Sequence, residues 1–452
     1  MKQIIATLAA LVLMTISVRA QANILDIENG EATTVGIYVK DLATGKVLAD
    51  HNGRLAMTPA SITKTLTSAT ALQLLGADFR FRTTVGLTGR RSATDNSCWE
   101  GDIVIKSCGD PTLESRELES AQGFTDSIVA AVKRLGITSF TGAVTIVEDM
   151  KDSGPHSKWE CEDIPWYYGV GLYGFNYRDN YVRAYPDSGV TTPPSVLDFD
   201  VRTWAERSTD QMRGITDHTL TVWAPATTRQ KNNWSIQTSN PDPAYTYANV
   251  LSDALMAAGI ENGAATVGDS CDSLFTVVYT HESPAATEIM KSLMKRSDNL
   301  FAEGMLRALV PGGSRDDCLA AELDYWRGNG LNVKATTILD GSGLSRADRF
   351  SPRFMSGLLE YMAKDDDIDT FITFFPIAGV DGGLENFGSK SALKDRLVVK
   401  TGSMSGVQCY AGYYLDRSGK PTHTVVVMVN GFFCPRATLK KQIEKYLLTI
   451  LK

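Results

Sequence analysis

The sequence predicts a mixed α/β (α+β) protein in which an antiparallel sheet with flanking helices carries a β-rich inserted lobe. Strand patterns occur near both ends of the chain, helical patterns lie between them, and a long stretch of short alternating runs separates the two parts. A chain of 452 residues is too long for one ordinary core. We expect residues 23–78 and 283–452 to form one domain and residues 79–282 an inserted β-rich region, possibly of two subdomains.

The first 22 residues have the pattern of a cleaved signal peptide. Lys2 precedes an apolar run over residues 4–18, and small residues follow at Ala20 and Ala22. That run is short for a membrane-spanning helix, and no later segment is long and apolar enough to be one. We therefore expect export across the inner membrane to the periplasm and no transmembrane segment in the mature protein.

The segment after the signal predicts two strands and a helix. Residues 33–53 form two strand-like runs around a turn at residues 43–45. A helical pattern then begins near Thr58 and is expected to stop at Gly76. Short alternating runs separated by Gly, Pro and Asn fill the following region up to Glu282.

Helical patterns return in the second half of the chain and strands close it. The expected helices lie within residues 285–310, 316–330 and 352–365, and the expected strands at 396–401, 409–416 and 422–431. A terminal helix places four apolar residues on one face, namely Leu439, Ile443, Leu447 and Leu451. Packing of this face on the sheet is the expected use, with membrane contact as the alternative.

Composition excludes several classes of function. A formal charge of −7 argues against a nucleic-acid partner, because phosphate neutralisation needs a basic face. There is no C-x-x-C pair and no H-E-x-x-H string, and the five histidines are scattered, so no metal and no cofactor is expected. Of the seven cysteines, Cys98 and Cys108 flank an extended run too long for a bond, whereas Cys409 and Cys434 bracket two strands and are candidates for a disulfide.

The first chemical motif is Ser61 followed three residues later by Lys64. This spacing brings a hydroxyl and an amine to one face of a helix, where serine can be a nucleophile and lysine its base. An S-x-x-K string also occurs by chance on solvated helices, so it needs further support.

Two further motifs supply that support. Ser297 and Asn299 lie at a junction between helical patterns, and Lys400, Thr401 and Gly402 lie at the end of a predicted strand. S-x-x-K, S-D-N and K-T-G together are the signature of penicillin-binding proteins and class A β-lactamases, and here they occur in that order. Taken singly, Ser297-Asp298-Asn299 could be merely a helix N-cap, with Asp298 a capping or structural residue, and Lys400-Thr401-Gly402 could be an ordinary strand end.

The chain resembles the penicillin-binding D-alanyl-D-alanine carboxypeptidases/endopeptidases that carry a large insert between the first and second motifs. The strings "CGDPTL", "SDNLFAEGMLR", "DGSGLSRADR" and "PIAGVDGGL" also match this family, while Gly383 stands where the family leads us to expect threonine. The resemblance implies a penicillin-binding-protein/β-lactamase-like, transpeptidase-like catalytic domain in residues 23–78 and 283–452. It further implies a serine hydrolase that cleaves peptidoglycan stem peptides through an acyl-enzyme and is acylated by β-lactams.

The chemistry of acyl transfer suggests a role for each motif residue. Ser61 would attack the amide carbonyl and Lys64 would take its proton, which requires a neutral amine. Burial and the nearby cation of Lys400 would both lower the pKa of Lys64. Ser297 would relay the proton to the leaving amine.

The remaining motif residues would bind the substrate. Asn299 would hold its backbone, and Lys400 with Thr401 would bind the terminal carboxylate of D-alanine. The resemblance assigns the oxyanion to the backbone N–H groups of Ser61 and Ser403.

Two recognition residues and two rival functions complete the expectations. Arg346 could pair with a stem carboxylate and Asp163 with a stem ammonium, although an ordinary surface ion pair is as good a reading of each. A β-lactamase of the same fold is one rival, but residues 324–348 contain no glutamate to activate a deacylating water. A catalytically silent cell-wall binding protein is the other, yet no motif member is missing.

Overall fold

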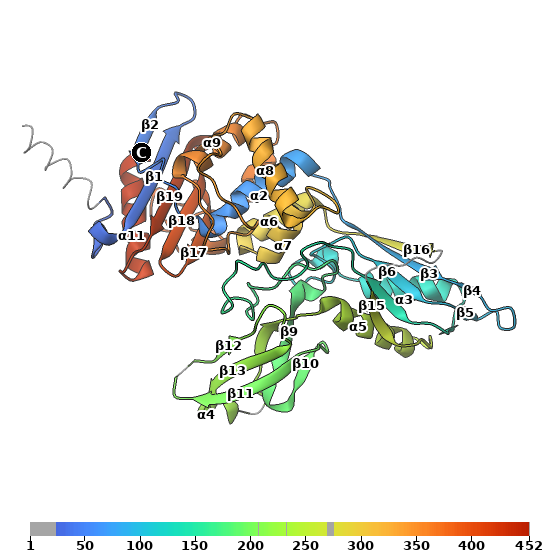
Figure 1. The fold of residues 1–452 in the computed structure, drawn as a ribbon. Coiled ribbons are helices and arrows are strands. Elements are labelled where there is room, and N and C mark those ends of the chain that lie inside the picture. Colours follow the sequence, from blue (N-terminus) through green and yellow to red (C-terminus); the bar gives the residue numbers. More distant parts are fainter. Residues whose placement is uncertain (1–23, 207, 232, 269–274, 452) are drawn as a thin grey trace, which may run out of the picture.

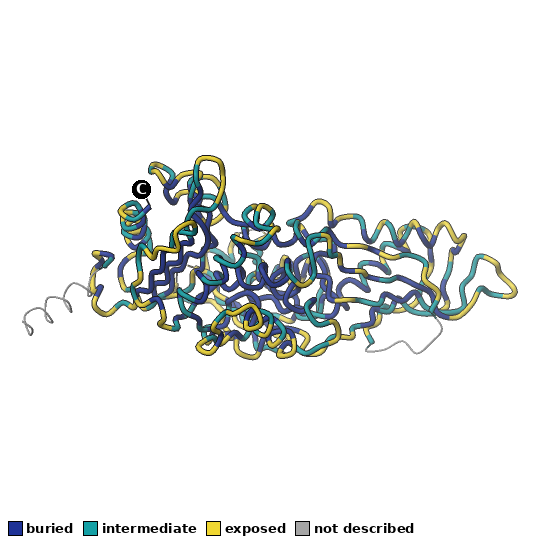
Figure 2. Tube along the Cα trace, turned by 90° about the horizontal axis from the view of Figure 1, so that it is seen from above, coloured by how far each residue is buried: buried dark blue, intermediate teal, exposed yellow. Residues whose placement is uncertain are grey.

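The computed structural model describes residues 24–206, 208–231, 233–268 and 275–451, so the expected signal peptide lies outside the described residues. The molecule is elongated, with the strands of both chain ends at one end and the middle of the chain at the other (Figure 1). A second view agrees and shows buried chain running through both parts (Figure 2). Among the helices so described, none has the length and apolar character needed to cross a bilayer.

An antiparallel five-stranded sheet joins the two ends of the chain. Its order is β17-β18-β19-β1-β2, and every neighbouring pair is antiparallel. The strands are β1 (Thr34–Asp41), β2 (Val47–His51), β17 (Leu397–Met404), β18 (Val407–Leu415) and β19 (Pro421–Asn430). The early strand pair and the three late strands were all predicted from the sequence.

Helices cover both faces of this sheet (Figure 1). On one face α11 (Arg436–Ile450) buries Leu439, Ile443 and Leu447, and Leu451 beyond it is buried as well, which confirms the predicted packing. Burying a leucine contributes roughly 1.5–3 kcal/mol. The other face meets a helical layer, which consists of α2 (Thr63–Leu75), α6 (Ala286–Arg296), α7 (Asn299–Arg307), α8 (Arg315–Gly328), α9 (Pro352–Met362) and the short α10 (Ile368–Ile372).

The middle of the chain builds a second five-stranded sheet of mixed direction, with the order β15-β8-β6-β3-β16. Its strands are β3 (Arg82–Thr88), β6 (Ile103–Lys106), β8 (Val144–Val147), β15 (Ala265–Gly268) and β16 (Phe275–Glu282). Two helices share its core, α3 (Phe124–Arg134) and α5 (Pro243–Ala257). The expectation of a β-rich region is thus incomplete, because these helices were not predicted.

Three small sheets lie in the same region. They are formed by β4 (Arg90–Arg91), β5 (Cys98–Glu100) and β7 (Ser139–Phe140); by β9 (Tyr181–Tyr185), β10 (Val190–Thr192) and β14 (Ile236–Ser239); and by β11 (Asp198–Trp204), β12 (Asp210–Met212) and β13 (Thr219–Pro225), the last leading into α4 (Ala226–Arg229). The third is the sheet at the lower edge of Figure 1.

The candidate disulfide between Cys409 and Cys434 does not form. Both are free, buried thiols. Cys409 packs in the core between the sheet and the helical layer, and its Sγ lies 3.5 Å from the carbonyl oxygen of Thr58. Cys434 packs in the core under α11, on the opposite face of the sheet. The sheet therefore separates the two sulfur atoms. Cys98 and Cys108 are also free, as expected.

Candidate active site

Ser61 and Lys64 meet where a tight turn leads into α2. Ser61 belongs to a 3-10 turn over Ala60–Ile62. Ala60 has φ of +49°, a left-handed conformation that is uncommon for a residue with a Cβ and often marks functional sites. Lys64 is fully buried, and its Nζ lies 3.0 Å from Ser61 Oγ. The structure thus contains the contact that the three-residue spacing predicts.

Two oxygen atoms fix the direction of the Lys64 amine. Nζ donates to Oδ1 of Asn299 at 2.5 Å and to the carbonyl oxygen of Ser342 at 2.7 Å. The Asn299 amide is itself oriented, because its Nδ2 donates to the carbonyl oxygen of Tyr168 at 2.6 Å. A neutral amine has two N–H groups and one lone pair. With both N–H groups directed at acceptors, the lone pair faces the Ser61 hydroxyl.

Burial favours the neutral form of Lys64. Desolvation lowers the pKa of this amine to about 8, while Asp340, Asp298 and Glu303 oppose the shift. The sequence prediction did not include the effect of these three carboxylates on the pKa of Lys64. The predicted repulsion between the two lysines affects the pKa of Lys400 instead. Burial, followed by the charge of Lys64, lowers that pKa well below its usual range.

Ser297 and Lys400 form a second hydroxyl–amine pair. Ser297 lies between α6 and α7 with φ of +63°, and its Oγ accepts from Lys400 Nζ at 3.0 Å. Lys400 also donates to the carbonyl oxygen of Thr401 at 2.7 Å. Asp298 is the N-cap of α7, where its carboxylate accepts from the N–H of Phe301 at 2.9 Å. The capping reading therefore holds for Asp298, while Ser297 faces the site.

Strand β17 brings the third motif against the turn that carries Ser61. The strand continues to Met404, whereas the sequence suggested an end near Thr401. Gly402 makes the close approach: a Cβ there would lie 2.7 Å from the Pro59 carbonyl oxygen and 2.9 Å from the Ser61 nitrogen. Ser403, the next residue, is exposed. The three motifs, remote in sequence, therefore surround one hydroxyl.

Replacement of Gly402 by alanine should reduce the rate of acylation by roughly 100-fold, in line with the cost of misplacing reacting groups by about 1 Å. The added methyl would collide with backbone atoms, which cannot move without displacing Ser61. The rate can be followed with a chromogenic β-lactam. Gly357→Ala on α9 is the control, because a Cβ at that position would lie 3.9 Å from Cγ of Leu331, which is an ordinary contact distance. Equal rates for the two variants would contradict the close approach.

Gly383, the departure from the family pattern, lies beside Thr401. A Cβ at this position would be 2.5 Å from Thr401 Oγ1. The glycine thus leaves the threonine hydroxyl free of a neighbouring side chain on this side.

Arg346 and Asp163 lie among charged groups rather than against the motif residues. Arg346 Nε is 3.7 Å from Oε1 of Glu160, and this pair is partly exposed. Oδ1 of Asp163 accepts from the Tyr168 hydroxyl at 3.2 Å, and burial raises the pKa of its carboxyl group. Tyr168 in turn touches Asn299 through its backbone, so the loop with Asp163 adjoins the site.

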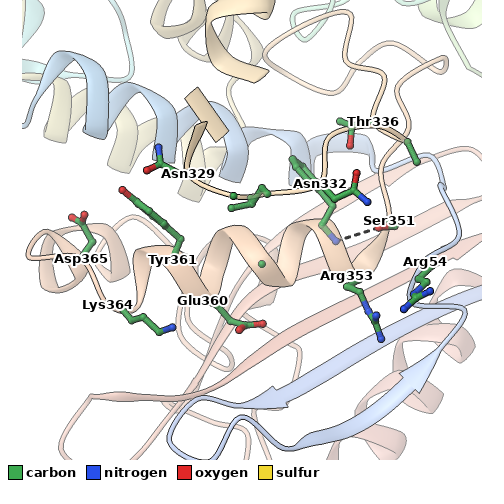
Figure 3. A pocket seen from close by; sticks show the side chains of 15 residues that line it. Arg54, Asn329, Asn332, Thr336, Ser351, Arg353, Glu360, Tyr361, Lys364 and Asp365 are labelled. Carbon is green, nitrogen blue, oxygen red and sulfur yellow. Dashed lines mark hydrogen bonds between the residues drawn. The ribbon is translucent and has the colours of Figure 1, made fainter. Parts of the chain in front are cut away.

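Two cavities bear on where the catalytic site lies. One of about 70 Å³ is lined by residues of the second motif and by Tyr167 and Tyr168. A broader pocket of about 850 Å³ lies beside α9 and is lined by Asn329, Asn332, Arg353 and Tyr361, among others (Figure 3). Its described lining contains no predicted site residue, so its size does not mark the site of catalysis.

Sequence reasoning missed several contributors to the site, of which two touch Lys64 or the Asp340 loop directly. The Ser342 carbonyl is a backbone group, and its string "DGSGLSR" was noticed only as a match to a family. Trp159, from the inserted region, donates through Nε1 to Oδ2 of Asp340 at 2.8 Å. Spacing along the chain gives no signal for a contact across 181 positions.

The fold and the paired serine and lysine residues define a serine enzyme of the penicillin-binding class. The chain belongs to the D-Ala-D-Ala carboxypeptidase 3 (S13) family, whose model matches residues 19–449. This match confirms both the predicted family and the predicted type of enzyme, a serine-type D-Ala-D-Ala carboxypeptidase.

Individual relatives agree with this assignment. The chain is 25% identical over 430 residues to the D-alanyl-D-alanine carboxypeptidase DacB of Haemophilus influenzae, covering 89% of this chain and 86% of the relative. It is 26% identical over 436 residues to the D-alanyl-D-alanine carboxypeptidase of Actinomadura sp. strain R39, covering 88% and 78%. The crystal structure of penicillin-binding protein 4 (dacB) of H. influenzae, 24% identical, matches with a TM-score of 0.80 over 93% of this chain and 97% of that one. The likeness confirms the predicted fold class.

Proposed function

We propose that the protein removes the terminal D-alanine from peptidoglycan stem peptides, and also cuts peptide cross-links, through an acyl-enzyme on Ser61. The observation that carries this proposal is the position of Lys64 Nζ, 3.0 Å from Ser61 Oγ and beside two further acceptors, which in the neutral amine leave the lone pair for the Ser61 hydroxyl. The family match supports the type of substrate, and the geometry supports Ser61 as the nucleophile and Lys64 as its base.

Acylation begins when Ser61 Oγ attacks the carbonyl carbon of the penultimate D-alanine and its proton passes to Lys64 Nζ. The N–H groups of Ser61 and Ser403 hold the oxyanion. The C–N bond then breaks, and the proton moves from Lys64 through Ser297 to the leaving amine. Water attacks the resulting ester, which releases the shortened peptide and restores the Ser61 hydroxyl. No cofactor enters either half of the cycle.

The third motif binds the end of the substrate. Lys400 and Thr401 present an amine and a hydroxyl to the terminal carboxylate, whose negative charge favours protonation of the amine, and Asn299 holds the peptide backbone. Since β-lactams mimic the acyl-D-Ala-D-Ala end, they acylate the same serine. We place this activity in the periplasm, where the signal pattern in residues 1–22 would deliver the enzyme.

The function can be tested with the purified protein and two substrates. A pentapeptide ending in D-Ala-D-Ala should yield free D-alanine, and intact sacculi should yield products that show whether cross-links are cut. Penicillin should block both reactions. A protein that binds the pentapeptide but releases no D-alanine would be the silent binding protein considered above.

Replacement of Arg346 by alanine should lower turnover several-fold on stems whose third residue carries a free side-chain carboxylate. The guanidinium is partly exposed and already lies near the carboxylate of Glu160, so a stem carboxylate can replace that partner. Turnover should be measured on stems with and without the carboxylate. Equal losses on both stems would eliminate the proposed contact.

A further inference from the structure

Glu303 is a buried carboxylate behind the active site to which the reaction above gives no role. It lies on α7 one helical turn after Asn299, and only 1% of its surface is exposed. Its Oε1 accepts from the backbone N–H of Gly341 at 3.0 Å and of Ser342 at 2.9 Å. Two hydrogen bonds accepted by one buried carboxylate oxygen fix the backbone at Gly341 and Ser342.

The backbone that Glu303 holds is the loop that presents an acceptor to Lys64. Ser342 gives its N–H to Glu303 and its carbonyl oxygen to Lys64 Nζ, at 2.7 Å. Asn299, on the same helix, contacts Nζ directly at 2.5 Å. Helix α7 therefore controls both oxygens that orient the base, one through its own side chain and one through the loop.

The rest of the loop is equally constrained. Asp340 accepts from the N–H of Gly343 at 2.6 Å and of Ser345 at 2.7 Å. Gly343 has φ of +75°, and a Cβ there would lie 2.1 Å from the carbonyl oxygen of Ala60, the residue before the nucleophile. The loop thus packs directly against the turn that carries Ser61. A shift of the loop backbone would therefore displace both the nucleophile and the base.

We propose that Glu303 is a positioning residue for the general base: it holds the Gly341–Ser342 backbone so that the Ser342 carbonyl turns the Lys64 lone pair toward Ser61. This inference rests on the proposed function, in which Lys64 is that base.

The charge of Glu303 adds an effect that can be separated from its geometry. Burial, followed by the neighbouring Asp340, raises the pKa of Glu303, and its ionised form raises the pKa of Lys64. Among the described residues its Oε2 has no hydrogen-bond partner, and Arg315 Nε lies 4.0 Å away. Glutamine at this position keeps an acceptor oxygen and loses the charge, whereas alanine loses both.

The experiment measures the rate of acylation by penicillin across pH for Glu303→Gln and Glu303→Ala. The glutamine variant should keep the plateau rate within about threefold, with the midpoint of its pH profile moved to lower pH, because an anion near Lys64 has been removed. The acylation rate of the alanine variant should be about 10- to 100-fold lower at every pH. A misplaced general base lowers reaction rates by about this factor.

Glu322 provides the matched control. It is a fully buried glutamate on α8 whose Oε1 accepts from Thr70 Oγ1 at 3.1 Å, and burial raises its pKa to about 8. Glu322→Gln and Glu322→Ala should lose stability to a similar degree without moving the midpoint of the pH profile. Thermal melting shows whether each variant is folded. If Glu303→Ala does not fold, the acylation rate of Glu303→Gln and the midpoint of its pH profile still test the inference.

The inference is overturned if Glu303→Ala acylates as fast as Glu322→Ala, or if Glu303→Gln loses as much rate as Glu303→Ala. A wild-type protein that is not acylated by penicillin would instead refute the proposed function. The two failures are therefore distinguishable.

Discussion

Replacement of Ser61 by alanine is expected to abolish the covalent reaction with penicillin and to lower D-alanine release by at least about 10,000-fold, as for other nucleophiles that act as a unit with their base. The variant keeps the buried Lys64 and the surrounding donors, but it has no oxygen to form an ester. Intact-protein mass spectrometry, followed by peptide mapping, should show the penicillin adduct in the wild type on the peptide that contains residue 61.

Ser68→Ala is the control for this experiment. Ser68 is buried on α2 seven positions later, and within the described structure its Oγ has no hydrogen-bond partner. Its removal should leave acylation unchanged while testing the same substitution on the helix that follows the Ser61 turn. An adduct on Ser61→Ala, or an adduct on a different peptide of the wild type, would contradict the assignment of the nucleophile.

The motif residues were predictable because each motif is short and has fixed spacing. Ser61 and Lys64 are brought together by one turn of helix, a relation that the sequence shows directly. Ser297 and Lys400 are 103 positions apart, and only the joint presence of three strings suggested that they meet. The hydrogen bond between Lys400 and Ser297 results from the overall fold, and a local sequence pattern does not predict such a contact.

The contributors that escaped prediction are of two physical kinds. The Ser342 carbonyl is a backbone group, which every residue possesses, so residue type carries no information about it. Glu303 and Trp159 act on the loop around Asp340 from a neighbouring helix and from the inserted region, and their roles depend on how these elements pack. Such relations become visible only in three dimensions.

Two details differ from the prediction, although the fold class is confirmed, and each has its own cause. Helix α3 carries Phe124, Ile128 and Val132 on one buried face, so its signal was present but was outweighed by the strand patterns on either side. The candidate disulfide failed because Cys434 lies beyond the last strand, where alternation no longer tells which face of the sheet a side chain occupies. The bracketing of two strands by cysteines was therefore too weak a criterion.

Replacement of Lys64 by methionine is expected to lower the rate of acylation by at least about 1,000-fold and to remove its dependence on pH near 8. In the proposed mechanism only the neutral amine can accept the Ser61 proton, and burial lowers the pKa of Lys64 to about 8. Below that pH the rate should fall about tenfold for each unit, and above it the rate should level off, because the amine is already neutral. Stopped-flow acylation at saturating penicillin measures both quantities.

Lys40→Met serves as the control, since Lys40 is a partly buried lysine of β1 that pairs with Glu360 at 2.5 Å, away from the motif residues. It should retain the wild-type rate and pH profile, so any general effect of removing a lysine is accounted for. Methionine at position 64 keeps most of the buried volume, which separates loss of the base from loss of packing. If Lys64→Met retained a rise in rate centred near pH 8, another group would have to be the base, and the orientation of the Lys64 amine by Asn299 and Ser342 would need a different explanation.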